Sequence, residues 1–182
     1  RLPRSPEVHR DIAGAYTRLG RPDEAEAQFR RAISLRPDSW SIYWYYGGFL
    51  SRANRYEEAE NAFRQALTRV PDNARIHSSL GGVLLARGRL EDAQKTLERS
   101  IELQPTAPAA SNLGTLLYQR GDYPAAVSAY ETATSLSPRD YRLWRNLAAG
   151  YDKAPGRQDR AAEAYRRALD LAAQERALDP TD

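Results

Sequence analysis

Prolines recur along the chain at a nearly constant interval. Pro3, Pro37, Pro71 and Pro105 are each 34 residues apart, and Pro138 follows after 33. Each of the later prolines stands just past an amphipathic run, where a helix has to stop. A fixed period of this length indicates internal repeats, each of which buries its apolar face against its neighbours. The chain is therefore restricted to a stack of five similar blocks.

Small residues occupy the same columns when the blocks are aligned with that proline at position 32. The small columns are position 8 (Ala13, Gly47, Gly81, Gly114, Ala148), position 20 (Ala25, Ala59, Ala93, Ala126, Ala161) and position 27 (Ala32, Ala66, Ser100, Ala133, Ala168). Position 24 is bulky and holds Phe29, Phe63, Leu97, Tyr130 and Tyr165. Helix backbones approach closely only where the facing residues are small. The columns thus predict two antiparallel helices per block, with the bulky column packed between them.

The predicted turns agree with this periodicity. Between the two helices of a block one residue has to adopt a left-handed conformation, which glycine and asparagine tolerate best. That column holds Gly20, Asn54, Gly88 and Gly121. Prolines also stand in the first turn of predicted helices, where a missing amide proton costs nothing. These are Pro6, Pro22, Pro108 and Pro124.

The period, the Leu-Gly pairs at Leu80-Gly81 and Leu113-Gly114, the alanine and phenylalanine columns and the closing proline together resemble the tetratricopeptide repeat family. The resemblance covers residues 6–178 and implies an all-α fold, a right-handed superhelical solenoid of antiparallel helix pairs. We expect one domain over residues 1–182, with repeats at 6–39, 40–73, 74–106, 107–140 and 141–178. Residues 1–5 would be the tail of a missing upstream repeat. The related pentatricopeptide family, which reads RNA, has a 35-residue period instead.

The fifth block departs from the pattern. Ala154-Pro155-Gly156 replaces a single turn glycine, and no closing proline interrupts the second helix, which is predicted to run from Gln158 to Leu178. This long helix either caps the stack or leads out of it.

The resemblance also implies where a ligand binds, since positions 2, 5, 6, 9, 12 and 13 of the first helices line the concave face in the family. Cations there include Arg10, Arg75, Arg142 and Arg145, and aromatic rings come from Trp44, Tyr45 and Tyr118. Asn112 and Asn146 follow at position 6, where an amide can bond to an extended peptide backbone. We therefore expect an acidic or carboxylate-bearing peptide in this groove. Alternatively, some of these arginines are only solvated and Trp44 belongs to the core.

Composition excludes several other functions. A net charge of +3 is too small to indicate nucleic-acid binding, and no apolar run is long enough to cross a membrane. Without cysteine there is no thiolate metal site, which leaves the compartment open, with the cytoplasm as default and the periplasm as alternative. His9 and His77 share position 4, two blocks apart, and are predicted to be interhelical contacts. No catalytic motif occurs, so we expect a non-catalytic protein with no metal and no cofactor.

A second function stays open at this point. The chain has no methionine, even at position 1, so we expect it to be a piece of a longer protein. Its last block loosely resembles repeat arrays attached to bacterial kinases and nucleotide cyclases, and Asn112 with Asn146 resembles a feature of sugar-transferase arrays. The alternative function is therefore an architectural spacer within a larger bacterial signalling or secretion protein, with homo-oligomers forming through the stack ends.

Overall fold

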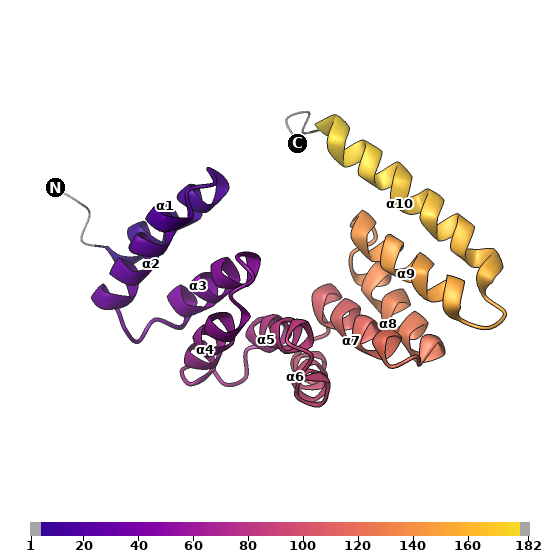
Figure 1. Cartoon of the computed structure of the whole chain (residues 1–182), viewed down its shortest axis with the longest axis horizontal. Helices are drawn as coiled ribbons and strands as arrows, with labels where there is room; N and C mark the ends of the chain where they lie inside the picture. Colours follow the sequence, from indigo (N-terminus) through magenta and orange to yellow (C-terminus); the bar gives the residue numbers. More distant parts are fainter. Residues whose placement is uncertain (1–4, 179–182) are drawn as a thin grey trace. The chain divides into compact units, whose positions relative to one another are not determined.

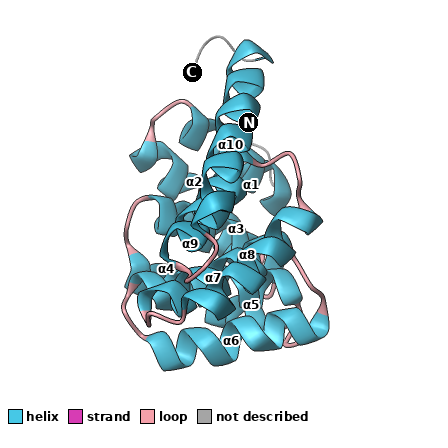
Figure 2. Cartoon of the chain, turned by 90° about the vertical axis from the view of Figure 1, so that its right-hand side faces the viewer, coloured by secondary structure: helices cyan, strands magenta, loops and turns pink. Residues whose placement is uncertain are grey.

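The computed structural model describes residues 5–178, and ten helices with no strand make up this part of the chain (Figures 1 and 2). The helices are α1 (Pro6–Arg18), α2 (Pro22–Leu35), α3 (Trp40–Arg52), α4 (Tyr56–Leu67), α5 (Ala74–Ala86), α6 (Leu90–Leu103), α7 (Ala107–Gln119), α8 (Tyr123–Leu136), α9 (Tyr141–Lys153) and α10 (Gln158–Leu178). The predicted all-α class is confirmed. Residues 1–4, most of the predicted upstream tail, lie outside the described residues.

The chain divides into two compact units, Arg1–Arg89 and Leu90–Asp182. In the first unit α1 packs on α2 and α3 on α4, while in the second α7 packs on α8 and α9 on α10. The second helix of a repeat also contacts the first helix of the next one, as α2 contacts α3 and α8 contacts α9. Within each unit, the complete hairpins are therefore held both by their own two helices and by a neighbouring repeat.

The small columns are buried as predicted. Ala25, Ala59, Ala93 and Ala126 are fully buried, as are three of the four alanines at position 27. In the second and fourth repeats the bulky column explains why position 8 holds glycine. A Cβ added to Gly47 would lie 2.7 Å from the Phe63 ring, and one added to Gly114 would lie 2.7 Å from the Tyr130 ring. These rings fill the space that a side chain would occupy.

The turn column is confirmed by its backbone conformation. Gly20, Asn54, Gly88 and Gly121 all have positive φ, with Asn54 at 58°. Gly156 in the longer fifth loop has positive φ as well, at 70°. The left-handed residue that reverses the chain is therefore present in all five hairpins, and the longer loop of the fifth keeps it.

One residue of the bulky column is not packed. Tyr165 is 41% exposed, whereas Phe29, Phe63, Leu97 and Tyr130 are buried. The expectation that position 24 is buried in every block was wrong for the fifth. The physical reason is that these side chains also need the first helix of a following repeat to cover them, and no helix follows α10 among residues 5–178.

Candidate functional site

Arg10, Trp44, Tyr45 and Ser79 form a continuous row of side chains across α1, α3 and α5, which we call the unit 1 face. The guanidinium of Arg10 lies over the Tyr45 ring, 5.0 Å from its centroid, and also pairs with Asp11 at 2.8 Å. The Trp44 ring lies 5.0 Å from that of Tyr45, and its Nε1 donates to Ser79 Oγ at 3.2 Å. Tyr45 remains 47% exposed, so an aromatic surface is held in place and open to a ligand.

A corresponding row occurs in the second unit. Asn146 of α9 donates from Nδ2 to Ser111 Oγ of α7 at 3.3 Å, beside the half-buried Asn112 and the exposed Arg145. We call Ser111, Asn112, Arg145 and Asn146 the unit 2 face. It presents two amides, a hydroxyl and a guanidinium rather than aromatic rings, so it suits hydrogen bonding to a peptide backbone.

Both faces follow one register rule. The side chain at position 5 of a repeat contacts the side chain at position 6 of the next, as in the pairs Arg10 with Tyr45, Trp44 with Ser79, and Ser111 with Asn146. Positions 5 and 6 of successive repeats therefore lie side by side within each unit, and both are among the positions that the family resemblance implies for a ligand-binding surface.

The other predicted site residues lie in more varied surroundings. Arg75 is exposed at the start of α5, and its carbonyl accepts a hydrogen bond from Ser79. Arg142 is also exposed, but its guanidinium is bonded to Asp140, whose side chain caps α9. The ring of Tyr118 meets the edge of Tyr123 at 5.3 Å and packs partly buried against the core of the second unit. Tyr118 is therefore turned toward the second helix of its own repeat.

The sequence reasoning missed a set of ion pairs that join neighbouring repeats. Glu26 of α2 accepts two bonds from Arg55, at 2.8 and 2.9 Å, and one from the Tyr46 hydroxyl at 2.8 Å. Glu60 of α4 is only 6% exposed and binds Arg64, Arg87 and Arg89. The signal was available, because Glu26 and Glu60 are one 34-residue period apart, and so are Arg55 and Arg89.

These contacts shift the acidities of the carboxyl groups. Hydrogen bonds from Arg55 lower the pKa of Glu26 to about 2, against the opposing effect of its burial. Burial raises the pKa of Glu60, but Arg64 and Arg87 more than compensate, so the pKa lies below its usual value. In the second unit, burial and the bond to Glu131 raise the pKa of Tyr151 to about 12. Several arginines thus serve the junctions between repeats rather than a ligand.

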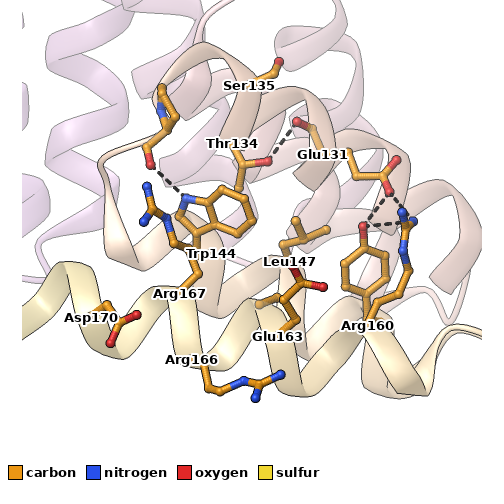
Figure 3. A pocket seen from close by; sticks show the side chains of 13 residues that line it. Glu131, Thr134, Ser135, Trp144, Leu147, Arg160, Glu163, Arg166, Arg167 and Asp170 are labelled. Atoms are coloured by element: carbon orange, nitrogen blue, oxygen red, sulfur yellow. Dashed lines mark hydrogen bonds and ion pairs between the residues drawn. The ribbon is translucent and has the colours of Figure 1, made fainter.

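A groove of about 870 Å³ lies between α8, α9 and α10 in the second unit. Figure 3 shows Trp144 at its centre, donating from Nε1 to the Pro138 carbonyl at 2.9 Å. At one end Glu131 accepts a 2.6 Å bond from the Tyr151 hydroxyl. The charged residues that line the groove are Arg160, Arg166, Arg167, Glu131, Glu163 and Asp170. These charges balance, so the groove does not select a ligand by its sign. The groove could not be predicted from the sequence, because it depends on the relative orientation of α8, α9 and α10.

The two histidines have different environments. His9 is buried, and its Nδ1 lies 2.6 Å from Gln28 Oε1 on α2, which confirms the predicted interhelical contact. His77 is half-buried, and its Nε2 lies 2.7 Å from the carbonyl of Pro71 in the preceding loop, so its predicted interhelical partner was wrong. Within residues 5–178 no cluster of metal-ligating side chains is present, and no helix there is long and apolar enough to cross a membrane.

Stacked helical hairpins with a left-handed turn residue and a shared register define a helical repeat protein, a class that acts through its surface rather than through an enclosed active site. Family models described as tetratricopeptide repeat match residues 50–116 in one case, and residues 10–59 and 111–176 in another. The chain belongs to the tetratricopeptide repeat family. No curated protein sequence matches it.

Solved structures agree on the fold. A thermophilic tetratricopeptide protein of Thermus thermophilus, TTC0263, is 21% identical over 96% of this chain and 95% of its own, with a TM-score of 0.81. MamA is 20% identical over 97% and 96%, with a TM-score of 0.71. YrrB, described as having an unusual peptide-binding site, is 22% identical over 90% and 84%, with a TM-score of 0.62. At these identities the likeness concerns the fold alone.

Proposed function

We propose that this protein is a non-catalytic scaffold that binds an extended, acidic segment of another protein on the unit 1 face. Proteins of this family generally act as interaction scaffolds, and the similar protein YrrB has a peptide-binding site. The observation that carries the proposal is Tyr45, a tyrosine that stays 47% exposed although Arg10 and Trp44 hold its ring. An aromatic side chain fixed before binding loses little entropy when a ligand covers it.

Within the unit 1 face Arg10 is paired with Asp11, so the cations that favour a carboxylate ligand are Arg75 and Arg52 at other groove positions of the same unit. Among the residues that the structure describes, Arg75 has no ion-pair partner, and Arg52 stands exposed at the end of α3. A guanidinium binds a carboxylate through two parallel hydrogen bonds, which a lysine cannot reproduce. The ligand that fits is thus an apolar side chain flanked by Asp or Glu.

The unit 2 face supports a role in holding the backbone of such a segment. Asn112 is half-buried and makes no side-chain hydrogen bond within residues 5–178, while Asn146 already binds Ser111. Arg145 adds an exposed cation beside them. Arg142 would have to release Asp140 before binding a ligand, so we assign it a smaller share.

Fluorescence anisotropy with paired synthetic peptides tests the proposal. Peptides that carry Asp and Glu around one apolar residue should bind, and the same peptides with Lys and Arg in place of the acids should not. Tyr45→Ala should weaken binding about tenfold or more, as for an aromatic anchor, whereas Tyr45→Phe keeps the ring and should bind nearly normally. Arg75→Ala should lower affinity, while Arg31→Ala, an exposed arginine on α2, serves as the control for net charge. Equal binding of both peptide sets, or full affinity of Tyr45→Ala, would contradict it.

An architectural role is the second candidate, in which the ends of the array contact other proteins. The exposure of Tyr165 and Leu169 on α10 favours it, because position 24, which holds Tyr165, is buried in the other four repeats. A spacer that uses its ends leaves both faces free, so the two functions are compatible.

A further inference from the structure

The groove between α8, α9 and α10 contains an aromatic ring that no cation of the chain covers. Trp144 stands at position 4 of its block, as Tyr43 does in the second block. There the guanidinium of Arg69 lies over the Tyr43 ring, 4.8 Å from its centroid, and donates to the Pro37 carbonyl at 2.7 Å. The residue that corresponds to Arg69 in the fifth block is Leu171, which is buried. Among residues 5–178 no cation lies over the Trp144 ring, so its place is open to a ligand.

Two opposite charges on α10 stand beside this ring without pairing. Glu163 and Arg167 are four residues apart in the order that favours an ion pair on a helix, yet in the described part of the chain no such pair joins them. In Figure 3 the Arg167 guanidinium lies on the Nε1 side of the indole, and the Glu163 carboxylate lies toward Leu147. The corresponding positions of α4 hold the neutral Asn61 and Gln65. Both unpaired charges are therefore particular to this groove.

The remaining charges of the groove are engaged or lie away from the ring. A carboxylate oxygen of Glu131 lies 3.6 Å from a guanidinium nitrogen of Arg160, so these two neutralise each other. Figure 3 shows Arg166 pointing away from the indole and Asp170 beyond Arg167, at the far end of the groove. One free charge of each sign is left beside the ring. A ligand that carried only one sign would meet a like charge.

A following repeat would not fill this groove. Elsewhere the next first helix packs on position 24, as the Phe29 ring of α2 lies 5.5 Å from both Tyr46 and Phe49 of α3. Position 24 of α10 is Tyr165, which does not line the groove. The three helices that form the groove all belong to the second unit. The groove is therefore a surface of its own, separate from the side on which repeats stack.

We propose that this groove binds an extended segment of a partner protein in which an arginine and an acidic residue stand two positions apart. Such side chains leave an extended backbone on the same side, about 7 Å apart. Glu163 and Arg167 are separated by about 6 Å along the helix axis, so the two spacings match. The partner's arginine stacks on Trp144 and pairs with Glu163, while its carboxylate pairs with Arg167. This ligand differs from the acidic segment proposed for the unit 1 face.

Fluorescence anisotropy with two labelled peptides of equal length tests the charge pairing. A peptide with Arg-Leu-Glu at its centre should bind the unmodified chain at least about tenfold more tightly than one with Arg-Leu-Arg, whose second cation would face Arg167. Arg167→Glu should reverse this preference. Arg166→Glu is the matched control, because it makes the same change of charge one residue away, on a side chain that points out of the groove. It should keep the preference of the unmodified chain.

Nuclear magnetic resonance locates the bound peptide. The indole N–H signal of Trp144, assigned by its loss in Trp144→Phe, should shift as the Arg-Leu-Glu peptide is added. Tyr45→Ala, on the unit 1 face, should leave this binding unchanged. Loss of binding in Tyr45→Ala would put the peptide on the unit 1 face, which contradicts the groove as the site and leaves the function proposed above standing.

Three other results would overturn the proposal. The first is equal affinity of the unmodified chain for the two peptides, or no binding of either. The second is a reversed preference in Arg166→Glu as well as in Arg167→Glu, because total charge and not the groove would then decide binding. The third is binding of the Arg-Leu-Glu peptide that leaves the Trp144 signal in place.

Discussion

Gly47 on α3 faces the ring of Phe63 on α4 so closely that a Cβ would lie 2.7 Å from the ring. Phe63 is buried and cannot move its ring away without opening the core of its unit. Gly47→Ala should therefore destabilise the protein by about 1 to 3 kcal/mol, the usual cost of overpacking.

The matched control is Gly14, which lies in α1 with no other atom near a Cβ. Gly14→Ala should raise stability by about 0.5 to 1 kcal/mol, because alanine loses less backbone entropy in a helix. Urea unfolding of both variants checks the pair. Equal effects at the two positions would mean that the contact with Phe63 is not what selects glycine.

Glu60 is the most buried carboxylate of the junctions, and three arginines surround it. Glu60→Gln removes the charge and leaves these guanidinium groups to water, which they can partly reach. We expect a loss of about 1 to 3 kcal/mol, below the cost for a fully buried pair. Glu57→Gln, at an exposed site one turn earlier, should be nearly neutral. A double-mutant cycle with Arg87→Gln should give a coupling energy above zero, and additive effects would contradict the contact.

The low pKa of Glu26, about 2, makes the stability of the first unit depend on acid. A carboxyl group whose folded pKa is depressed stabilises fully above its unfolded pKa of 4.5 and loses that contribution as pH falls toward 2. The loss amounts to at most about 3 kcal/mol. Between pH 5 and pH 2, urea midpoints should fall more steeply for the unmodified chain than for Glu26→Gln. Parallel curves for the two proteins would show that Glu26 is not the group responsible.

Asn54 has φ of 58°, in the left-handed region, and its Oδ1 accepts a 2.7 Å bond from the Tyr56 hydroxyl. Asn54→Ala should cost about 1 kcal/mol, since a Cβ without a local hydrogen bond disfavours this conformation. Asn54→Gly relieves the strain and should be close to neutral. Melting temperatures of the two variants should differ clearly, and a harmless alanine would contradict the turn geometry.

Local chemistry explains why so much of the fold could be predicted. The turn column needs a residue that tolerates positive φ, and glycine or asparagine occupies it. Position 8 needs a residue that leaves room for an aromatic ring, and glycine or alanine occupies it. Both features could therefore be predicted from the residue types alone. Tyr165 could not be predicted in the same way. Tyr165 is a bulky residue like the others at position 24. Its burial, however, depends on a following helix, and the alignment of residue types does not show whether that helix is in place.

The candidate site shows a similar division. The groove positions that the family resemblance implies put Trp44 and Tyr45 on one surface, and in the structure their rings lie 5.0 Å apart. The same implied positions predicted a groove-lining role for Tyr118 in the second unit, yet its ring meets Tyr123 at the start of α8. Register does not decide which of two neighbours a long side chain contacts, and for the same reason His77 turned to the Pro71 carbonyl.

The ion pairs of Glu26 and Glu60 bear on how such an array can change its length. Each carboxylate comes from one block and binds an arginine of the following block at a matching place in the period, Arg55 for Glu26 and Arg89 for Glu60. Duplicating a whole block would insert a donor and an acceptor together and regenerate the same junction on both sides, whereas an insertion of any other size would separate them. An array that lengthens by whole repeats therefore keeps the ion pairs between repeats as well as their packing.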